Sequence, residues 1–125
     1  MENVLLAGLG GFIGTVFRFL LNNLVYHYLP STSFPYGTLV VNVLGCLIIG
    51  FLNGLADNRG MFTADLRIFI FIGILGGFTT FSSFGYDTFG LARSGQLWLA
   101  GLNIFLQIFL GLSAVILGYI STRLL

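Results

Sequence analysis

The positions of the charged residues constrain this chain more than any other feature of its sequence. Five arginines and four acidic residues are the only charged side chains among 125 residues. Between them lie long uncharged runs at 19–56, 68–86 and 94–122. A helix needs about 20 apolar residues to cross about 30 Å of hydrocarbon. The sequence therefore predicts an integral membrane protein, because about a quarter of the residues in a soluble domain would be charged.

The longest uncharged run is interrupted by a turn. Pro30 and Pro35 flank a Ser-Thr-Ser sequence, which is typical of turns and not of helix interiors. We therefore expect an all-α membrane protein with four transmembrane helices. The connections are too short for another domain, so residues 1–125 are expected to form a single four-span membrane domain. The expected spans lie roughly at 4–25, 36–56, 67–91 and 97–121.

The composition excludes several other classes of protein. The net charge is only +1, so the chain offers no basic patch for nucleic acid. No pair of nucleophile and general base is recognisable, and the single histidine, His27, lies in an expected loop, so we do not expect an enzyme. The many glycines are expected to let helices approach closely, as in the small-residue pairs Gly10/Gly14 and Gly50/Gly54.

The arginines give only a weak signal for orientation. Four spans place both termini and the connection between spans two and three on one side, with Arg59, Arg67 and Arg123. The other side has Arg93, and also Arg18 if that residue lies near its face. This small difference leaves two alternatives: insertion in one direction, or insertion in both directions to form an antiparallel homodimer. Because four helices hold too few polar groups to line a conduit alone, we expect a two-fold dimer.

The third span contains the densest polar segment of the chain, GGFTTFSSFG at 76–85. Two glycines and two β-branched threonines disfavour a regular helix there. The sequence leaves two alternatives: a helix broken near its middle, or a continuous helix whose hydroxyls bond to its own carbonyls. Carbonyls freed by a break suit a cation such as sodium, whereas helix N-termini and hydroxyls suit an anion. Phe78, Phe81 and Phe84 recur every three residues, which predicts one helical face.

The remaining polar side chains of the spans form spaced pairs. Thr38 and Asn42 lie four residues apart in span two, and Asn103 and Gln107 repeat that spacing in span four. Each pair could bond to a neighbouring helix or present donors to an ion. Arg18 could extend to the membrane surface or add positive potential to an anion pathway. No carboxylate lies at mid-span, which favours a passive pathway over proton coupling.

These segments resemble the signatures of the Fluc (CrcB) family of fluoride channels. The specific parts are Asn42 at the end of GTLVVN and the run GGFTTFSSF at 76–84, with GGFIG at 10–14 and Arg18 in support. The resemblance covers the whole chain, including its length, four spans and motif order. One departure is Gly111, where the family commonly has Ser, so a vestibule hydroxyl is either missing here or replaced by water.

The resemblance implies a passive, fluoride-selective channel in the cell membrane that lets fluoride leave the cytoplasm and so confers fluoride resistance. It implies an antiparallel, dual-topology homodimer with two fluoride pathways. It further implies a structural sodium ion on the two-fold axis, held by backbone carbonyls of Gly76 and Thr79 from both subunits. Phe81 and Phe84 would turn their ring edges to fluoride, and Asn42 would donate to it. The residues implied to line the rest of the pathway or its vestibule are Ser82, Ser83, Asn103, Gln107, Thr38 and Arg18.

Two other classes fit parts of the sequence. Small multidrug exporters also have four spans, but they rely on a glutamate in span one, where this chain has Arg18 and no acid. A non-transporting membrane subunit would fit the composition but would leave the polar segment of span three unexplained.

Overall fold

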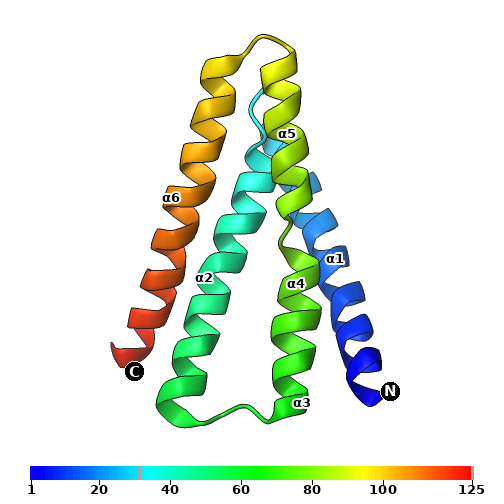
Figure 1. Ribbon diagram of the computed structural model, residues 1–125, viewed down its shortest axis with the longest axis vertical. Helices are drawn as coiled ribbons and strands as arrows, with labels where there is room; N and C mark the ends of the chain where they lie inside the picture. Colours follow the sequence, from blue (N-terminus) through cyan, green and yellow to red (C-terminus); the bar gives the residue numbers. More distant parts are fainter. Residues whose placement is uncertain (31, 125) are drawn as a thin grey trace.

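The computed structural model describes residues 1–30 and 32–124. In that part of the chain all regular structure is helical, and four segments are long and apolar enough to cross a membrane (Figure 1). The prediction of an all-α protein with four membrane-spanning helices is therefore confirmed. The four segments are Glu2–Tyr28, Tyr36–Arg59, Ala64–Arg93 and Leu97–Leu124.

The first, second and fourth spans are regular helices. They are α1 (Glu2–Tyr28), α2 (Tyr36–Arg59) and α6 (Leu97–Ser121), the last followed by a 3-10 turn, η2 (Thr122–Leu124). Both ends of the chain lie at the same end of the bundle as the connection between α2 and the third span (Figure 1).

The third span is built from four pieces instead of one regular helix. It consists of α3 (Ala64–Arg67), the π-helical segment η1 (Ile68–Leu75), α4 (Gly76–Phe78) and α5 (Phe81–Arg93). At the end of η1 the Gly76 N–H reaches back five residues to the Phe71 carbonyl, as a π-helix requires. Such segments are rare and occur frequently at functional sites. No pattern in the sequence predicted this π-helical segment.

Thr79 and Thr80 interrupt the third span between α4 and α5. Both have extended backbones, with φ/ψ of −81°/157° and −150°/114°. Of the two alternatives that the sequence left open, the helix broken near its middle is therefore the one present, although the axis bends by only 15°. The prediction that three phenylalanines share one face is wrong, because the extended pair shifts the register. Phe78 is buried, whereas Phe81 is 82% exposed in the single chain.

Close helix contacts are made where glycines remove side chains. A Cβ on Gly10 would lie 2.9 Å from the Gly73 Cα, and a Cβ on Gly14 would collide with the Ile74 carbonyl. The backbone of α1 is therefore in direct contact with the backbone of the third span. Gly50 approaches the Val115 carbonyl in the same way, which joins α2 to α6. These contacts confirm the expectation that the small residues serve helix packing.

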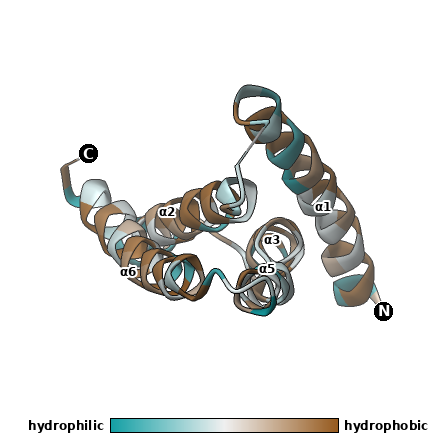
Figure 2. Ribbon diagram, turned by 90° about the horizontal axis from the view of Figure 1, so that it is seen from above, coloured by the Kyte–Doolittle hydropathy of each residue, from teal (hydrophilic) through white to brown (hydrophobic). Residues whose placement is uncertain are grey.

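The outer faces of the bundle are apolar. Seen from above, hydrophobic residues recur along the ribbons of α1 and α6, with paler and hydrophilic stretches between them (Figure 2). Large side chains such as Phe12, Phe17, Ile116 and Leu117 are more than half exposed there. Such surfaces are stable against lipid and not against water. Several polar groups of the spans instead bond to one another around the break.

Candidate functional site

The Asn42 side chain, from α2, holds the break in the third span. Its Oδ1 accepts from the Thr80 N–H at 2.9 Å, and its Nδ2 donates to the Thr80 carbonyl at 3.1 Å. A carboxamide that meets both backbone groups of one residue satisfies polar groups that the interrupted helix no longer pairs. Nδ2 also donates to Gln107 Oε1 at 3.1 Å, so Asn42 links α2, the break and α6. Both of its donor hydrogens are therefore engaged within the chain.

Thr80 begins the second half of the span. Its Oγ1 accepts from the Ser83 N–H at 3.2 Å, which is the usual arrangement of an N-cap threonine. The same hydroxyl lies 3.1 Å from Ser83 Oγ and 3.2 Å from Ser82 Oγ. Three hydroxyls are thus gathered at the N-terminus of α5, where the helix dipole favours negative charge. From the sequence, Thr80 was expected only to disfavour a regular helix, although its place before a helical run is also an N-cap signal.

Arg18 points into the protein toward the break. Its Nη1 donates to the Thr79 carbonyl at 3.4 Å, so of the two readings of this residue the structure favours the inward one. Arg18 lines a cavity of about 220 Å³ between α1, α2 and α5. Thr38, Thr80 and Ser83 line the same cavity. An anion in this cavity would meet one cation and several hydroxyls.

A second cavity, of about 370 Å³, also borders the break. It is lined by Phe81, Phe84, Asn42, Gln107 and Thr80, among others. The rings of Phe81 and Phe84 lie 5.4 Å apart with their planes at 65°, an edge-on arrangement. Thr80 lines both this cavity and the one that contains Arg18. The break therefore lies between two cavities, each of which is lined in part by polar side chains.

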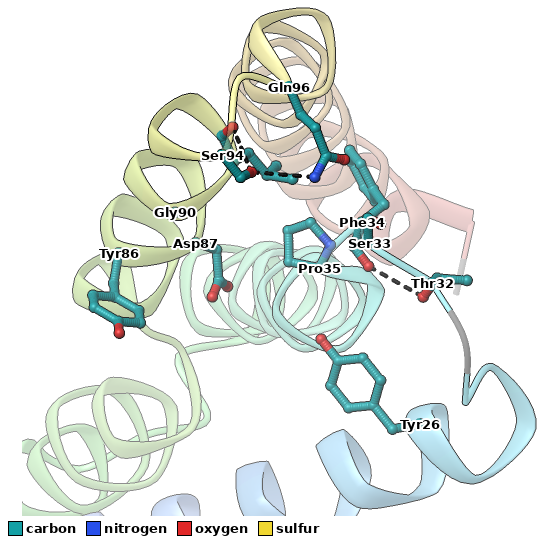
Figure 3. A pocket seen from close by; sticks show the side chains of 11 residues that line it. Tyr26, Thr32, Ser33, Phe34, Pro35, Tyr86, Asp87, Gly90, Ser94 and Gln96 are labelled. Atoms are coloured by element: carbon teal, nitrogen blue, oxygen red, sulfur yellow. Dashed lines mark hydrogen bonds between the residues drawn. The ribbon is translucent and has the colours of Figure 1, made fainter.

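A third cavity, of about 390 Å³, lies near the end of the bundle where α5 turns into α6. The Tyr26 hydroxyl and the Asp87 carboxylate both point into it (Figure 3). Thr38 Oγ1 donates to Asp87 Oδ2 at 2.6 Å. The single proton of the Thr38 hydroxyl is therefore directed to a carboxylate, and the Thr38 oxygen can only accept from other groups. Thr38 itself lines the cavity that contains Arg18, and it contacts this third, outer cavity only through Asp87.

The predicted polar residues of α6 are held by different partners. Gln107 bonds to Asn42 at the break, whereas Asn103, which is completely buried, donates from Nδ2 to Thr88 Oγ1 at 2.9 Å. Thr88 was not among the residues predicted to matter. The structure thus gathers Arg18, Asn42, Ser82, Ser83, Thr79 and Gln107 around the break. Asn103 lies one helical turn away, and the roles of all these residues toward an ion stay predictions.

The backbone at the break fits the donor set that sodium prefers. Thr80 N–H, which would donate to the Gly76 carbonyl in a continuous helix, donates instead to Asn42. The Gly76 carbonyl is thereby released, and unwound carbonyls are common sodium ligands in membrane proteins. The Thr79 carbonyl has left the helix too, but it already accepts from Arg18. Among the described residues no cluster of His, Cys, Asp or Glu is suited to a metal, so any cation here would depend on carbonyls.

Comparison with known proteins identifies the family. Residues 5–119 match the family described as "CrcB-like protein, Camphor Resistance (CrcB)". This chain belongs to that family. Similar relatives are named fluoride-specific ion channel FluC. One from Methylobacillus flagellatus is 44% identical over 95% of this chain and 93% of its own length. Another, from Nitratidesulfovibrio vulgaris, is 44% identical over 99% of both chains.

A third such relative, from Campylobacter jejuni, is 46% identical over 96% of this chain and 97% of its own length. The family predicted from the sequence motifs is therefore confirmed. The names of these relatives describe an ion channel and not an enzyme. Together with the four apolar helices, they identify this chain as a multi-pass membrane protein.

Proposed function

We propose that this chain forms a passive, fluoride-selective channel in the cell membrane, through which fluoride leaves the cytoplasm and which so confers fluoride resistance. The observation that carries the proposal is the break at Thr79–Thr80, which Asn42 holds open between two cavities. The near full-length similarity to proteins named fluoride-specific ion channels supports the choice of ion.

Neutral donors explain how such a site would pass a small, strongly hydrated anion. Fluoride must exchange its water for groups that bind it well but release it again. The hydroxyls of Ser82 and Ser83 at the N-terminus of α5 are donors of this kind. The positive edges of the Phe81 and Phe84 rings would add weak attraction without trapping the ion. Arg18 would attract fluoride to the neighbouring cavity.

Asn42 could donate to fluoride only by giving up one of the two hydrogen bonds that its Nδ2 already makes. One contact of its Nδ2 holds the Thr80 carbonyl, and the other is made to Gln107. An arriving fluoride would replace Gln107 as the acceptor, because loss of that bond leaves the backbone of the break in place. One hydrogen of Asn42 Nδ2 would therefore bond to Gln107 Oε1 in the absence of an ion and to fluoride when the ion is present.

We further propose that the working unit is an antiparallel, dual-topology homodimer. In the single chain Phe81 is 82% exposed, and the cavity that it lines also contains Gly76 and Thr79. A second chain packed on this side would complete the wall of the cavity. The carbonyls of Gly76 and Thr79 from both chains would then hold a sodium ion, which would supply positive charge at the centre of the assembly. The weak arginine bias supports insertion in both directions.

Ion efflux tests the proposed function. Purified protein is reconstituted into liposomes loaded with equal concentrations of fluoride and chloride, and both ions are followed with selective electrodes. The proposal predicts rapid fluoride release with far slower chloride release. Equal rates for the two ions, or rates no higher than in protein-free liposomes, would contradict it.

Forced orientation tests the dimer separately. Two lysines inserted into the connection between α2 and α3, next to Arg59, should direct all chains into one orientation. Activity should then fall when this variant is expressed alone. It should recover when the variant is co-expressed with a chain bearing lysines at Gly95, in the connection at the other end. Full activity of the first variant alone would count against dual topology.

A further inference from the structure

The outer cavity, near the turn from α5 to α6, has an acidic wall. Among the described residues that line it, Asp87 is the one charged side chain, and Tyr26, Ser94 and Gln96 are among the polar ones. The Asp87 carboxylate and the Tyr26 hydroxyl point into the cavity (Figure 3). Its volume is about 390 Å³, which is room for a group of several heavy atoms and not only for a bare ion.

Neither of the two nearest arginines along the spans neutralises Asp87. Arg93 follows six residues later, which is about 9 Å along α5 and about 240° around its axis. Arg18 donates to the Thr79 carbonyl. Within residues 1–30 and 32–124, the hydrogen bond to the Asp87 carboxylate comes from the neutral Thr38 hydroxyl. A half-buried carboxylate without an opposite charge favours a cation beside it.

The other polar groups of the wall present hydrogen-bond acceptors to the cavity. Ser94 Oγ donates its proton to the Leu91 carbonyl at 3.0 Å, and Thr32 Oγ1 donates to the Phe34 carbonyl at 3.3 Å. Gln96 Nε2 donates to Ser94 Oγ at 3.2 Å. Toward a ligand, the hydroxyl oxygens of Ser94 and Thr32 can therefore only accept, and so can Gln96 Oε1. Such a wall suits a ligand that is cationic and made of donors.

An organic ammonium group fits this wall better than a metal ion does. Calcium takes about six to eight oxygen ligands, including several carboxylates, whereas this wall supplies Asp87. The part of the chain that the structure describes has no cluster of His, Cys, Asp or Glu suited to a metal. A primary ammonium has three N–H donors and no acceptor. The rings of Tyr26, Phe34 and Tyr86 in the wall can add cation–π attraction.

The cavity lies where the headgroups of a bilayer would be. Its wall combines the ends of α1 and α5 with the connections that lead into α2 and α6, at one end of the bundle (Figure 1). At this end Tyr28, Tyr86 and Trp98 are 74%, 77% and 79% exposed, and such residues gather where a bilayer meets water. We propose that the outer cavity binds the primary ammonium of a phospholipid headgroup, as in phosphatidylethanolamine. This inference does not depend on the proposed function.

A series of headgroups tests the site in the purified protein. Delipidated protein in detergent receives phosphatidylethanolamine, its N-methyl and N,N-dimethyl derivatives, or phosphatidylcholine, all with the same acyl chains. Each methyl group removes one N–H donor and leaves the positive charge in place. Bound lipid is measured by native mass spectrometry. Binding should weaken along the series, and phosphatidylcholine should bind at least about tenfold more weakly, because its hydrogen bonds to a charged acceptor are lost.

Two variants test the role of the carboxylate. Asp87→Asn still offers Thr38 an acceptor but carries no charge, so phosphatidylethanolamine should bind about tenfold more weakly and lose its advantage over phosphatidylcholine. The matched control is Asp65→Asn, an exposed carboxylate on α3, which should bind like the wild type. Free ethanolamine at the same concentration should bind far more weakly than the lipid, since it has no acyl chains to hold it at this level.

Three results would overturn the inference. Equal binding of phosphatidylethanolamine and phosphatidylcholine would show that no N–H group is recognised. Equal binding by Asp87→Asn and Asp65→Asn would place the lipid away from this cavity. Free ethanolamine bound as tightly as the lipid would identify a soluble amine as the ligand. If Asp87→Asn does not fold, the headgroup series still decides, because it uses the wild-type protein.

Discussion

Replacing Asn42 with Leu should weaken the fold and the proposed pathway together. The change removes hydrogen bonds to Thr80 N–H at 2.9 Å, to the Thr80 carbonyl at 3.1 Å and to Gln107 Oε1 at 3.1 Å. Side-chain hydrogen bonds in membrane proteins contribute about 0.6 kcal/mol on average and about 1.7 at most. Three such bonds therefore correspond to about 2 kcal/mol on average and about 5 at most. Leu branches at the same carbon as Asn and is larger, so none of the loss would come from a cavity.

The matched control for this variant is Asn53→Leu. Asn53 lies on the same helix, eleven residues further along, which is about 16 Å at 1.5 Å per residue. Unfolding of both variants in detergent is followed by circular dichroism, and fluoride efflux is measured after reconstitution. Asn42→Leu should be less stable than Asn53→Leu by about 2 kcal/mol, and by about 5 at most, and should conduct less fluoride. Equal stability of the two variants would refute the idea that Asn42 holds the break.

Three further variants test other parts of the account. Phe81→Ile should reduce fluoride efflux at least tenfold, whereas Phe89→Ile, on the exposed surface of the same helix, should not; equal efflux would remove the Phe81 ring from the pathway. Gly14→Ala places a Cβ 2.8 Å from the Phe78 nitrogen and should lower the melting temperature by several degrees, while Gly8→Ala meets nothing within 4 Å. The same melting temperature for both would mean that α1 is free to move. Asp87→Asn keeps an acceptor for Thr38 but removes a negative charge from the outer cavity. It should speed fluoride efflux at low ionic strength and much less at high salt; a salt-independent effect would exclude an electrostatic cause.

The sequence predicted the spans and allowed the break as one of two alternatives, because both depend on local composition. Charges excluded from apolar runs define the four spans, and two glycines before two threonines weaken the helix where it is interrupted. The π-helical segment was missed, since IFIFIGIL reads like any buried helix. Whether a break also bends the axis depends on what replaces its hydrogen bonds. Here Asn42 does so from another helix, and the axis bends by only 15°.

The hydrogen-bond partners of the polar residues could not be predicted from the sequence, because they lie far away along the chain. A spacing of four places Thr38 and Asn42 on one face, and it says nothing about what they meet. Thr38 meets Asp87, 49 residues away, and Asn42 meets Thr80, 38 residues away. These bonds decide which protons are free. They direct the Thr38 proton away from an anion and leave a free donor on Gln107 instead.

The most direct test of a passive fluoride pathway is the steady-state distribution of fluoride across a membrane of fixed potential. Proteoliposomes are clamped with potassium and valinomycin, and internal fluoride is measured with and without a pH gradient. The account predicts that fluoride distributes as a single negative charge would at each imposed potential, whatever the pH gradient. A distribution that shifts with the pH gradient would show proton coupling and contradict it.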